Sequence, residues 1–258
     1  MSGSGTLWLM PNALDFGVAV GAEPDLRQSL PLGVIEIAAR TGHWVVENAR
    51  SARHFLKRVD AVVALSQPLH SLDIVELPRP RKGTNAPPPD FKDLLDPARR
   101  GRDLALLSEA GLPAVADPGA ALVAAAHDEG IRVVALPGPS SILLALAASG
   151  LNGQSFAFVG YLPVESAERA LRIRELEVLS RRARQTQLMI ETPYRNPVLL
   201  DALLVQLQPS TKLSVSSGIT LASGWNRSDT VAGWRRKPQP MAAGIAADVP
   251  AVFALLAN

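Results

Sequence analysis

The chain of 258 residues contains no cysteine. This absence excludes disulfide frameworks, thiolate zinc fingers, iron–sulfur clusters and cysteine nucleophiles. Charge of one sign is not in excess either, because 26 Lys and Arg face 24 Asp and Glu for a formal net charge of +2. With 19 Gly and 21 Pro, the chain lies below the Gly and Pro content of low-complexity proteins. Hydrophobic residues make up 47%, which is enough for the cores of two domains.

Targeting and membrane signals are also missing from the sequence. Residues 1–6 contain no basic segment ahead of an apolar one, so they do not resemble a signal peptide. The longest uncharged stretch, 133–164, is interrupted by Gly and Pro and does not read as one membrane helix. We therefore expect a cytoplasmic protein that does not enter the membrane.

Short apolar runs alternate with longer helical patterns through most of the chain. Strands are expected at 7–10, 44–47, 104–108, 132–136, 157–160 and 187–191. Helices are expected at 49–59, 118–129, 139–149, 165–183 and 197–206, and further strands at 213–217, 230–233 and 252–256. This alternation indicates an α/β fold with largely parallel strand pairing.

The composition suggests two domains, 1–152 and 153–258. Gly150, Asn152 and Gly153 interrupt the pattern after an apolar helix, and the two parts carry net charges of −2 and +4. The Pro-rich basic segment 78–97 is expected to be a solvated connection, with a flap over an anionic substrate as the alternative.

Three strand-to-helix turns carry residues suited to ligand binding. The first contains Gly111 and ends on Asp117 and Pro118, which we expect to cap and begin a helix. The second is 136–141, in which two serines meet free N–H groups at a helix start. In the third, 191–197, Asn196 is expected to cap a helix. Such turns lie at the carboxyl ends of strands in α/β sheets, so they predict a cleft for an anionic or zwitterionic small molecule.

These turns, together with Phe158-Val159-Gly160-Tyr161-Leu162-Pro163, resemble the tetrapyrrole methylase superfamily. Within it, the chain is similar to short relatives of the branch that methylates small-subunit ribosomal RNA on the ribose 2′-oxygen. The resemblance implies two α/β domains with S-adenosylmethionine in a cleft between them, a homodimer, and no metal. It places the following residues at the cofactor: Pro11, Gly111, Leu112, Pro113, Asp117, Pro137, Gly138, Ser140, Ser141, Tyr161 and Thr192.

The chain also departs from the superfamily pattern. Leu112 replaces the Asp of the Gly-Asp-Pro turn, and the turn after the first strand, beginning at Pro11, has no glycine-rich loop. Both differences count against a corrin or porphyrin substrate. The catalytic candidates are Glu47 and Arg50, which survive from a Glu-Asp-Thr-Arg motif; an ion pair between them is the simpler interpretation. A protein that binds the cofactor but has lost catalysis, or a tetrapyrrole-type small-molecule methylase, remains an alternative function.

Several other residues have a structural explanation that we prefer. The four histidines are scattered and lack metal-ligand spacing. The arginines between 169 and 184 alternate with glutamates, which is typical of a solvated helix rather than an RNA contact. Trp225 and Trp234, near Arg227, Arg235, Arg236 and Lys237, are expected to be half-buried, although stacking on nucleotide bases is the alternative.

Overall fold

The structure is a computed structural model that describes residues 4–15, 18–19, 21–78, 91–236 and 248–258. It divides into two compact units. Unit 1 comprises residues 1–13 and 22–139, and unit 2 comprises residues 14–21 and 140–258. Most of the Pro-rich segment 78–97, and Lys237, lie outside the described residues.

Unit 1 is built on a parallel sheet of five strands in the order β3-β2-β4-β1-β5. The strands are β1 (Thr6–Met10), β2 (His43–Val46), β3 (Asp73–Glu76), β4 (Leu104–Leu107) and β5 (Arg132–Ala135). The helices are α1 (Leu32–Arg40), α2 (Ala49–Asp60), α3 (Asp96–Arg99) and α4 (Ala120–Asp128). Short 3₁₀ turns lie at Leu26–Gln28, Leu69–Ser71 and Lys92–Leu95.

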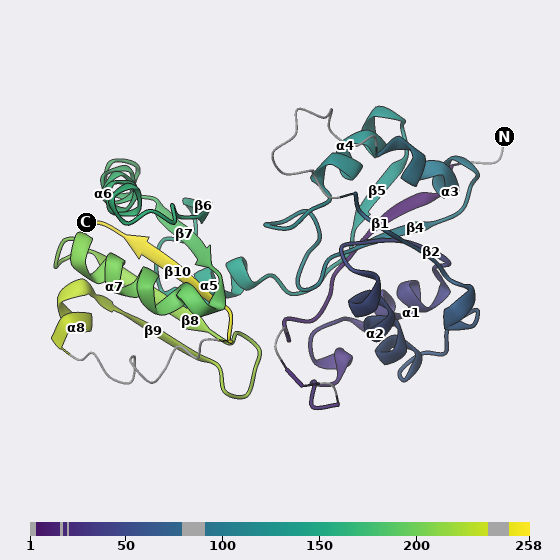
Figure 1. Cartoon of the computed structure of the whole chain (residues 1–258), viewed down its shortest axis with the longest axis horizontal. Coiled ribbons are helices and arrows are strands. Elements are labelled where there is room, and N and C mark those ends of the chain that lie inside the picture. Colours follow the sequence, from purple (N-terminus) through teal and green to yellow (C-terminus); the bar gives the residue numbers. More distant parts are fainter. Residues whose placement is uncertain (1–3, 16–17, 20, 79–90, 237–247) are drawn as a thin grey trace. The chain divides into compact units, whose positions relative to one another are not determined.

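The central strands β2, β4 and β1 are buried on both faces of this sheet, as is usual for parallel sheets, whereas the edge strands β3 and β5 are more exposed. Successive residues of β4 alternate between the two cores: Ala105 and Leu107 pack with α1 and α2, whereas Leu104 and Leu106 pack with α3 and α4. Figure 1 shows the two pairs of helices on opposite faces of the sheet. The burial of both faces explains why the strands read as apolar runs.

Unit 2 contains a mixed sheet in the order β6-β7-β10-β8-β9. Its strands are β6 (Phe156–Tyr161), β7 (Thr186–Glu191), β8 (Lys212–Ser217), β9 (Trp225–Thr230) and β10 (Ala251–Leu256). Its helices are α5 (Ser141–Ser149), α6 (Ser166–Ala183), α7 (Asn196–Gln206), which follows a 3₁₀ turn at Pro193–Arg195, and α8 (Val231–Arg236). Only β6 and β7 pair in parallel. The antiparallel pairs all involve β8, β9 or β10, in the last part of the chain, where the sequence has little helix between its expected strands.

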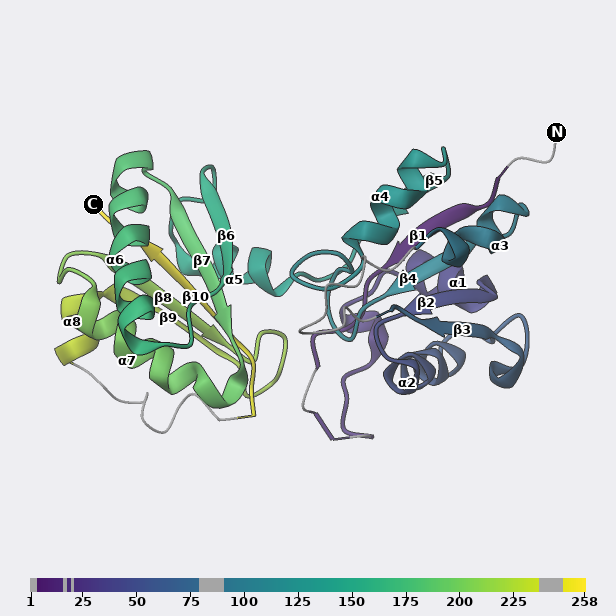
Figure 2. The ribbon, with the colours of Figure 1, turned by 45° about the horizontal axis from the view of Figure 1, so that its top comes forward.

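The helices of unit 2 also cover both faces of the sheet. One core joins α6, α7 and α8 to Met189 and Phe253, and the other joins α5 to Leu188 and Val252. Figure 2 shows α6 and α7 on one face and α5 on the other. Because α5 packs on this sheet, it groups with the second unit, whereas the expected division after residue 152 assigns it to the first.

Of the helices in the part of the chain that the structure describes, none combines the length and the apolar character that a membrane span requires.

Candidate functional site

The carboxyl edge of the unit 1 sheet is a topological switch point. From β1 the chain crosses over β4 to reach β2, and from β4 it crosses over β1 to reach β5. The connections therefore leave β1 and β4 in opposite directions. Parallel α/β sheets bind their ligands outside the carboxyl ends of strands at such a point.

Asn12 joins the loops that follow β1 and β4. Its backbone N–H donates to Gly111 O at 2.9 Å, and the Gly111 N–H donates back to Asn12 O at 3.1 Å. The Asn12 side chain is buried, and its Nδ2 donates to Glu109 O at 2.9 Å and to Ser108 O at 3.3 Å. The two loops are thus held together by both backbone and side chain.

The loop after β4 has an unusual backbone between residues 111 and 119. Ala114 and Ala116 have φ angles of 64° and 63°, and Gly111 and Gly119 also have positive φ. Non-glycine residues rarely adopt such φ angles. Where they do, the surrounding structure holds the backbone in a strained conformation, and such residues cluster at functional sites. Alternation of right- and left-handed residues turns successive N–H groups toward one side, which is suited to binding an anionic group.

Three carboxyl groups gather beside this loop. Glu47 follows β2, and its Oε2 accepts a hydrogen bond from the Glu109 N–H at 3.2 Å. The pKa of Asp117 is raised to about 7, mainly by burial and also by the negative charges of Glu47 and Glu109, while a hydrogen bond with Ser108 opposes the rise. A carboxyl group with a pKa near neutrality can take up or release a proton at physiological pH.

The loop after β5 packs directly against the loop after β1. A Cβ added to Gly138 would lie 2.2 Å from Pro11 Cβ and 2.5 Å from Pro11 Cγ. Real carbon atoms do not approach this closely, so only glycine fits at position 138 without a shift. The structure therefore brings these sequence-predicted residues to one edge of unit 1: Pro11, Glu47, Gly111, Leu112, Pro113, Asp117, Pro137 and Gly138.

The expected ion pair between Glu47 and Arg50 is wrong. Asn48 caps α2, and its Oδ1 accepts hydrogen bonds from the N–H groups of Arg50 and Ser51. Glu47 instead binds the loop after β4, and Arg50 is exposed and forms no ion pair with a carboxylate in the part of the chain that the structure describes.

Two helix starts also differ from those expected. Helix α4 begins at Ala120 with Gly119 as its N-cap, so Asp117 does not cap it and Pro118 is not its first residue. Asp117 belongs instead to the carboxyl cluster. Asn196 is the first residue of α7 rather than its cap, and its Nδ2 donates to Val249 O at 3.1 Å.

The remaining predicted cofactor residues lie in unit 2. Ser140 and Ser141 stand at the start of α5, where Ser140 is the N-cap residue and makes no capping hydrogen bond through its side chain. Tyr161 ends β6, with 60% of its surface exposed, and Thr192 directly follows β7. Because β6 and β7 are parallel neighbours, Tyr161 and Thr192 share one edge of the second sheet. Glu191 holds this turn by accepting from the Thr192 N–H at 2.8 Å and pairing with Arg195 at 3.3 Å.

Most other residues considered in the sequence have structural partners. On α6, Arg172 pairs with Glu175 at 3.2 Å, as expected for a solvated helix. That expectation is wrong for Arg169 and Glu177, which are buried: Arg169 donates to Val164 O, and Glu177 accepts from the Gln208 N–H. Trp234 is fully buried rather than half-buried as expected; it donates from Nε1 to Leu213 O at 2.7 Å and packs under the Arg227 guanidinium at 4.1 Å. His43 contacts Asp73, and His54 contacts Glu23. No group of three potential metal ligands occurs within the described ranges.

Sequence reasoning missed Asn12 and Glu109. Asn12 is the second residue after β1, and Glu109 is the second residue after β4. This position, in a turn that follows a strand, was the signal in the sequence that could have indicated a role at the site. The Glu109 carbonyl that Asn12 binds lies about a hundred residues away along the chain, and the Glu47 side chain that Glu109 binds lies more than sixty residues away. The contacts themselves could therefore not be predicted from the sequence.

Comparisons with known proteins agree with this architecture. Curated relatives named "Ribosomal RNA small subunit methyltransferase I" come from Mesorhizobium japonicum and Halalkalibacterium halodurans. They are 41% and 40% identical over 46% and 45% of this chain, but the matches cover 40% and 39% of their own lengths. The chain thus matches about two fifths of the length of these relatives.

Solved structures support the fold along nearly the whole chain. A uroporphyrin-III-C-methyltransferase from Thermus thermophilus matches 98% of this chain and 92% of its own, with a TM-score of 0.52 and 18% identity. A cobalt precorrin-4 methyltransferase matches 96% and 94%, with a TM-score of 0.52 and 13% identity. The family described as Tetrapyrrole (Corrin/Porphyrin) Methylases matches residues 49–223, more than half of the chain, and the chain therefore belongs to this family.

Proposed function

We propose that the chain is an S-adenosylmethionine-dependent methyltransferase that methylates small-subunit ribosomal RNA, at a ribose 2′-hydroxyl. The observation that carries this proposal is the interlocked set of loops after β1, β4 and β5, at the switch point of a tetrapyrrole methylase fold. The relatives named as small-subunit ribosomal RNA methyltransferases favour this acceptor over a tetrapyrrole. A ribosomal substrate favours a cytoplasmic location.

The residues at the carboxyl edge of unit 1 fit this cofactor. Gly138 lets the loop after β5 approach Pro11 closely, and the turn Gly111-Leu112-Pro113 leads into the loop with positive φ angles. When bound, the cofactor would supply an activated methyl group: the acceptor oxygen would bond to the methyl carbon as the carbon–sulfur bond breaks and the neutral thioether leaves, without a metal. The negative cluster of Glu47, Glu109 and Asp117 favours a cationic ligand, and Asp117 is able to take up the proton of the acceptor hydroxyl.

We also propose that residues of unit 2 bind the cofactor. The free N–H groups at the start of α5, with the Ser140 and Ser141 hydroxyls, suit the cofactor carboxylate. We assign Tyr161 and Thr192 to the same ligand because they lie together at one edge of the second sheet.

Transfer of a labelled methyl group tests the proposed reaction. Small ribosomal subunits lacking the modification are incubated with the protein and methyl-labelled cofactor, and the RNA is then hydrolysed with alkali. We expect label in alkali-stable dinucleotides, because a methylated 2′-oxygen cannot attack the neighbouring phosphate. Cofactor binding without label in RNA would indicate a binding protein without this activity and would contradict the proposal.

We further propose a homodimer formed through the outer face of α6. Its exposed residues Glu168, Leu171, Glu175, Val178 and Arg182 recur at the spacing of one helical face. Leu171, Val178 and the neighbouring Leu179 are 54%, 58% and 47% exposed. Two antiparallel copies of α6 centred on Glu175 would oppose Leu171 to Leu179, and Glu168 to Arg182. The two copies of Glu175 would meet at the axis, where each is paired with Arg172 of its own chain.

The substitution Leu171→Glu should convert this dimer to a monomer, because it places a carboxylate against an apolar side chain at each of two symmetric contacts. Light scattering of the full chain measures the mass. Val205→Glu, on α7, replaces a side chain that is 71% exposed outside this face, and it should leave the dimer intact. A wild-type monomer, or an unchanged mass for Leu171→Glu, would contradict the proposed interface.

A further inference from the structure

The loop after β1 is the meeting point of the loops at the carboxyl edge. Pro11 contacts the loop after β5 at Gly138, and Asn12 contacts the loop after β4. No other described residue bonds to the loop of 108–111 by both its backbone and its side chain. Asn12 is therefore placed to determine where that loop runs.

The Asn12 amide uses both of its ends. Its Nδ2 donates to the carbonyl groups of Ser108 and Glu109, and its Oδ1 accepts from the Ala13 N–H at 2.9 Å. Only 6% of the residue is exposed, so water does not replace these partners freely. A side chain of the same size without the amide donor would leave two carbonyl groups unpaired.

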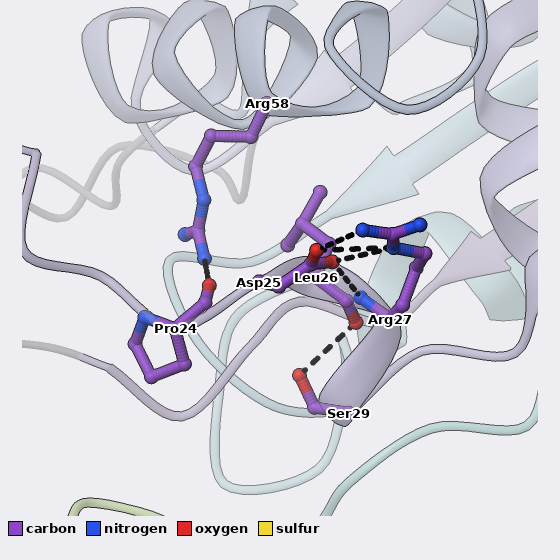
Figure 3. Close-up of polar contacts among 6 residues, drawn as sticks. All are labelled: Pro24, Asp25, Leu26, Arg27, Ser29 and Arg58. Carbon is purple, nitrogen blue, oxygen red and sulfur yellow. Dashed lines mark hydrogen bonds and ion pairs between the residues drawn. The ribbon is translucent and has the colours of Figure 1, made fainter.

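The far end of the same connection is fixed separately. The connection returns to unit 1 before α1, where Arg58 Nη2 of helix α2 donates to Pro24 O at 2.8 Å (Figure 3). Asp25 caps the following 3₁₀ turn and binds Arg27, which lowers the pKa of Asp25 to about 2 (Figure 3). Loss of the Asn12 contacts would therefore free the loop after β4 without releasing the whole connection.

We propose that Asn12 is a positioning residue for the cofactor. It does not touch the reacting atoms; it holds Ser108, Glu109 and Gly111, and through them the turn that approaches the cofactor. This inference rests on the proposed function. It makes one side chain responsible for the conformation of the loop that contains Gly111, Leu112, Pro113 and Asp117.

Calorimetric titration with S-adenosylmethionine tests this role in Asn12→Ala. We expect the affinity to fall about tenfold or more, which corresponds to the loss of one or two net hydrogen bonds. Asn152→Ala is the matched control, because Asn152 ties a turn of unit 2 in the same manner, by donating to Arg184 O at 2.7 Å and accepting from the Gln154 N–H at 3.0 Å. It should lower the thermal midpoint while leaving the affinity within about twofold.

The variant Asn12→Asp separates positioning from general loss of stability. An ionised carboxylate cannot donate to the Ser108 and Glu109 carbonyl groups, whereas a protonated one can donate once. The affinity of Asn12→Asp, divided by that of Asn12→Ala at the same pH, should therefore rise as the pH falls. The ratio to Asn12→Ala removes the contribution of Asp117, which titrates in the same range.

The outcomes distinguish this inference from the proposed function. If the wild-type chain does not bind the cofactor, the proposed function fails. If the wild type binds and Asn12→Ala binds equally well, the role of Asn12 is refuted. The role is also refuted if Asn12→Ala and Asn152→Ala lower the thermal midpoint equally and Asn12→Ala loses no more affinity than Asn152→Ala. A flat affinity ratio between Asn12→Asp and Asn12→Ala across pH would also refute it.

Discussion

Asp117→Asn should make the protein more stable than the wild type at pH 8, and the advantage should shrink as the pH falls. The folded pKa of Asp117 is about 7, against an ordinary value of 3.8. Between these values the folded chain holds a proton that the unfolded chain has lost, so wild-type stability falls as the pH rises. The difference in unfolding free energy between variant and wild type should grow by at most about 3 kcal/mol from pH 5 to pH 8.

Urea unfolding at a series of pH values measures this difference. Asp128→Asn is a suitable control, since Asp128 is exposed on α4 and its side chain makes no hydrogen bond or ion pair with the residues that the structure describes. Its stability curve should stay parallel to that of the wild type. Parallel curves for Asp117→Asn as well would show that Asp117 is ionised in the folded protein throughout this range.

Gly138→Ala should destabilise unit 1 and weaken cofactor binding. The added Cβ would meet the Pro11 ring at 2.2 Å, and neither the proline ring nor the backbone at 138 can move aside by a rotamer change. Overpacking of this kind costs about 1–3 kcal/mol, and here the shift falls on the two loops that hold the site. Unfolding by urea and calorimetric titration measure the two effects.

Gly33→Ala provides the matched control. Gly33 lies near the start of α1, and a Cβ added there meets nothing within 4 Å. Alanine favours the helix by about 1 kcal/mol relative to glycine, so this variant should be slightly more stable than the wild type. Equal effects of the two substitutions on stability and affinity would show that the packing of Pro11 against position 138 can accommodate a Cβ, and would contradict the prediction.

Much of the first sheet could be predicted because its strands are buried on both faces. Four of its strands appear as apolar runs close to the expected positions. Strand β3 (Asp73–Glu76) was missed because it is an edge strand with mostly exposed residues and two acidic ends. Helices α1 and α3 were also missed; α3 is only four residues long, and α1 begins with Leu32 and Gly33 after a proline.

The end of the chain was less predictable. Residues 230–233 were expected to form a strand, but β9 (Trp225–Thr230) precedes them and α8 (Val231–Arg236) contains most of them. Strand β9 has the sequence WNRSDT, with little β-branched or apolar character, and is stabilised by pairing with β8. Pairing between strands is a tertiary contact, which a local pattern does not reveal.

The candidate site could be predicted in part from its glycines and prolines. Gly111 and Gly138 occupy the positions where the backbone needs a positive φ or a close approach. The roles of the polar residues were harder to predict. Asn12, Glu47 and Glu109 act through partners in the loops that follow other strands, and Asp117 lies in a carboxyl cluster instead of its expected capping position.

Calorimetric titration of the wild-type chain with S-adenosylmethionine is the most direct test of the central claim, that the carboxyl edge of unit 1 holds this cofactor. We expect saturable heat with the cofactor and with its demethylated product, reduced in Gly138→Ala and unchanged in Gly33→Ala. The absence of heat at millimolar cofactor, with a protein that is folded by circular dichroism, would contradict the claim.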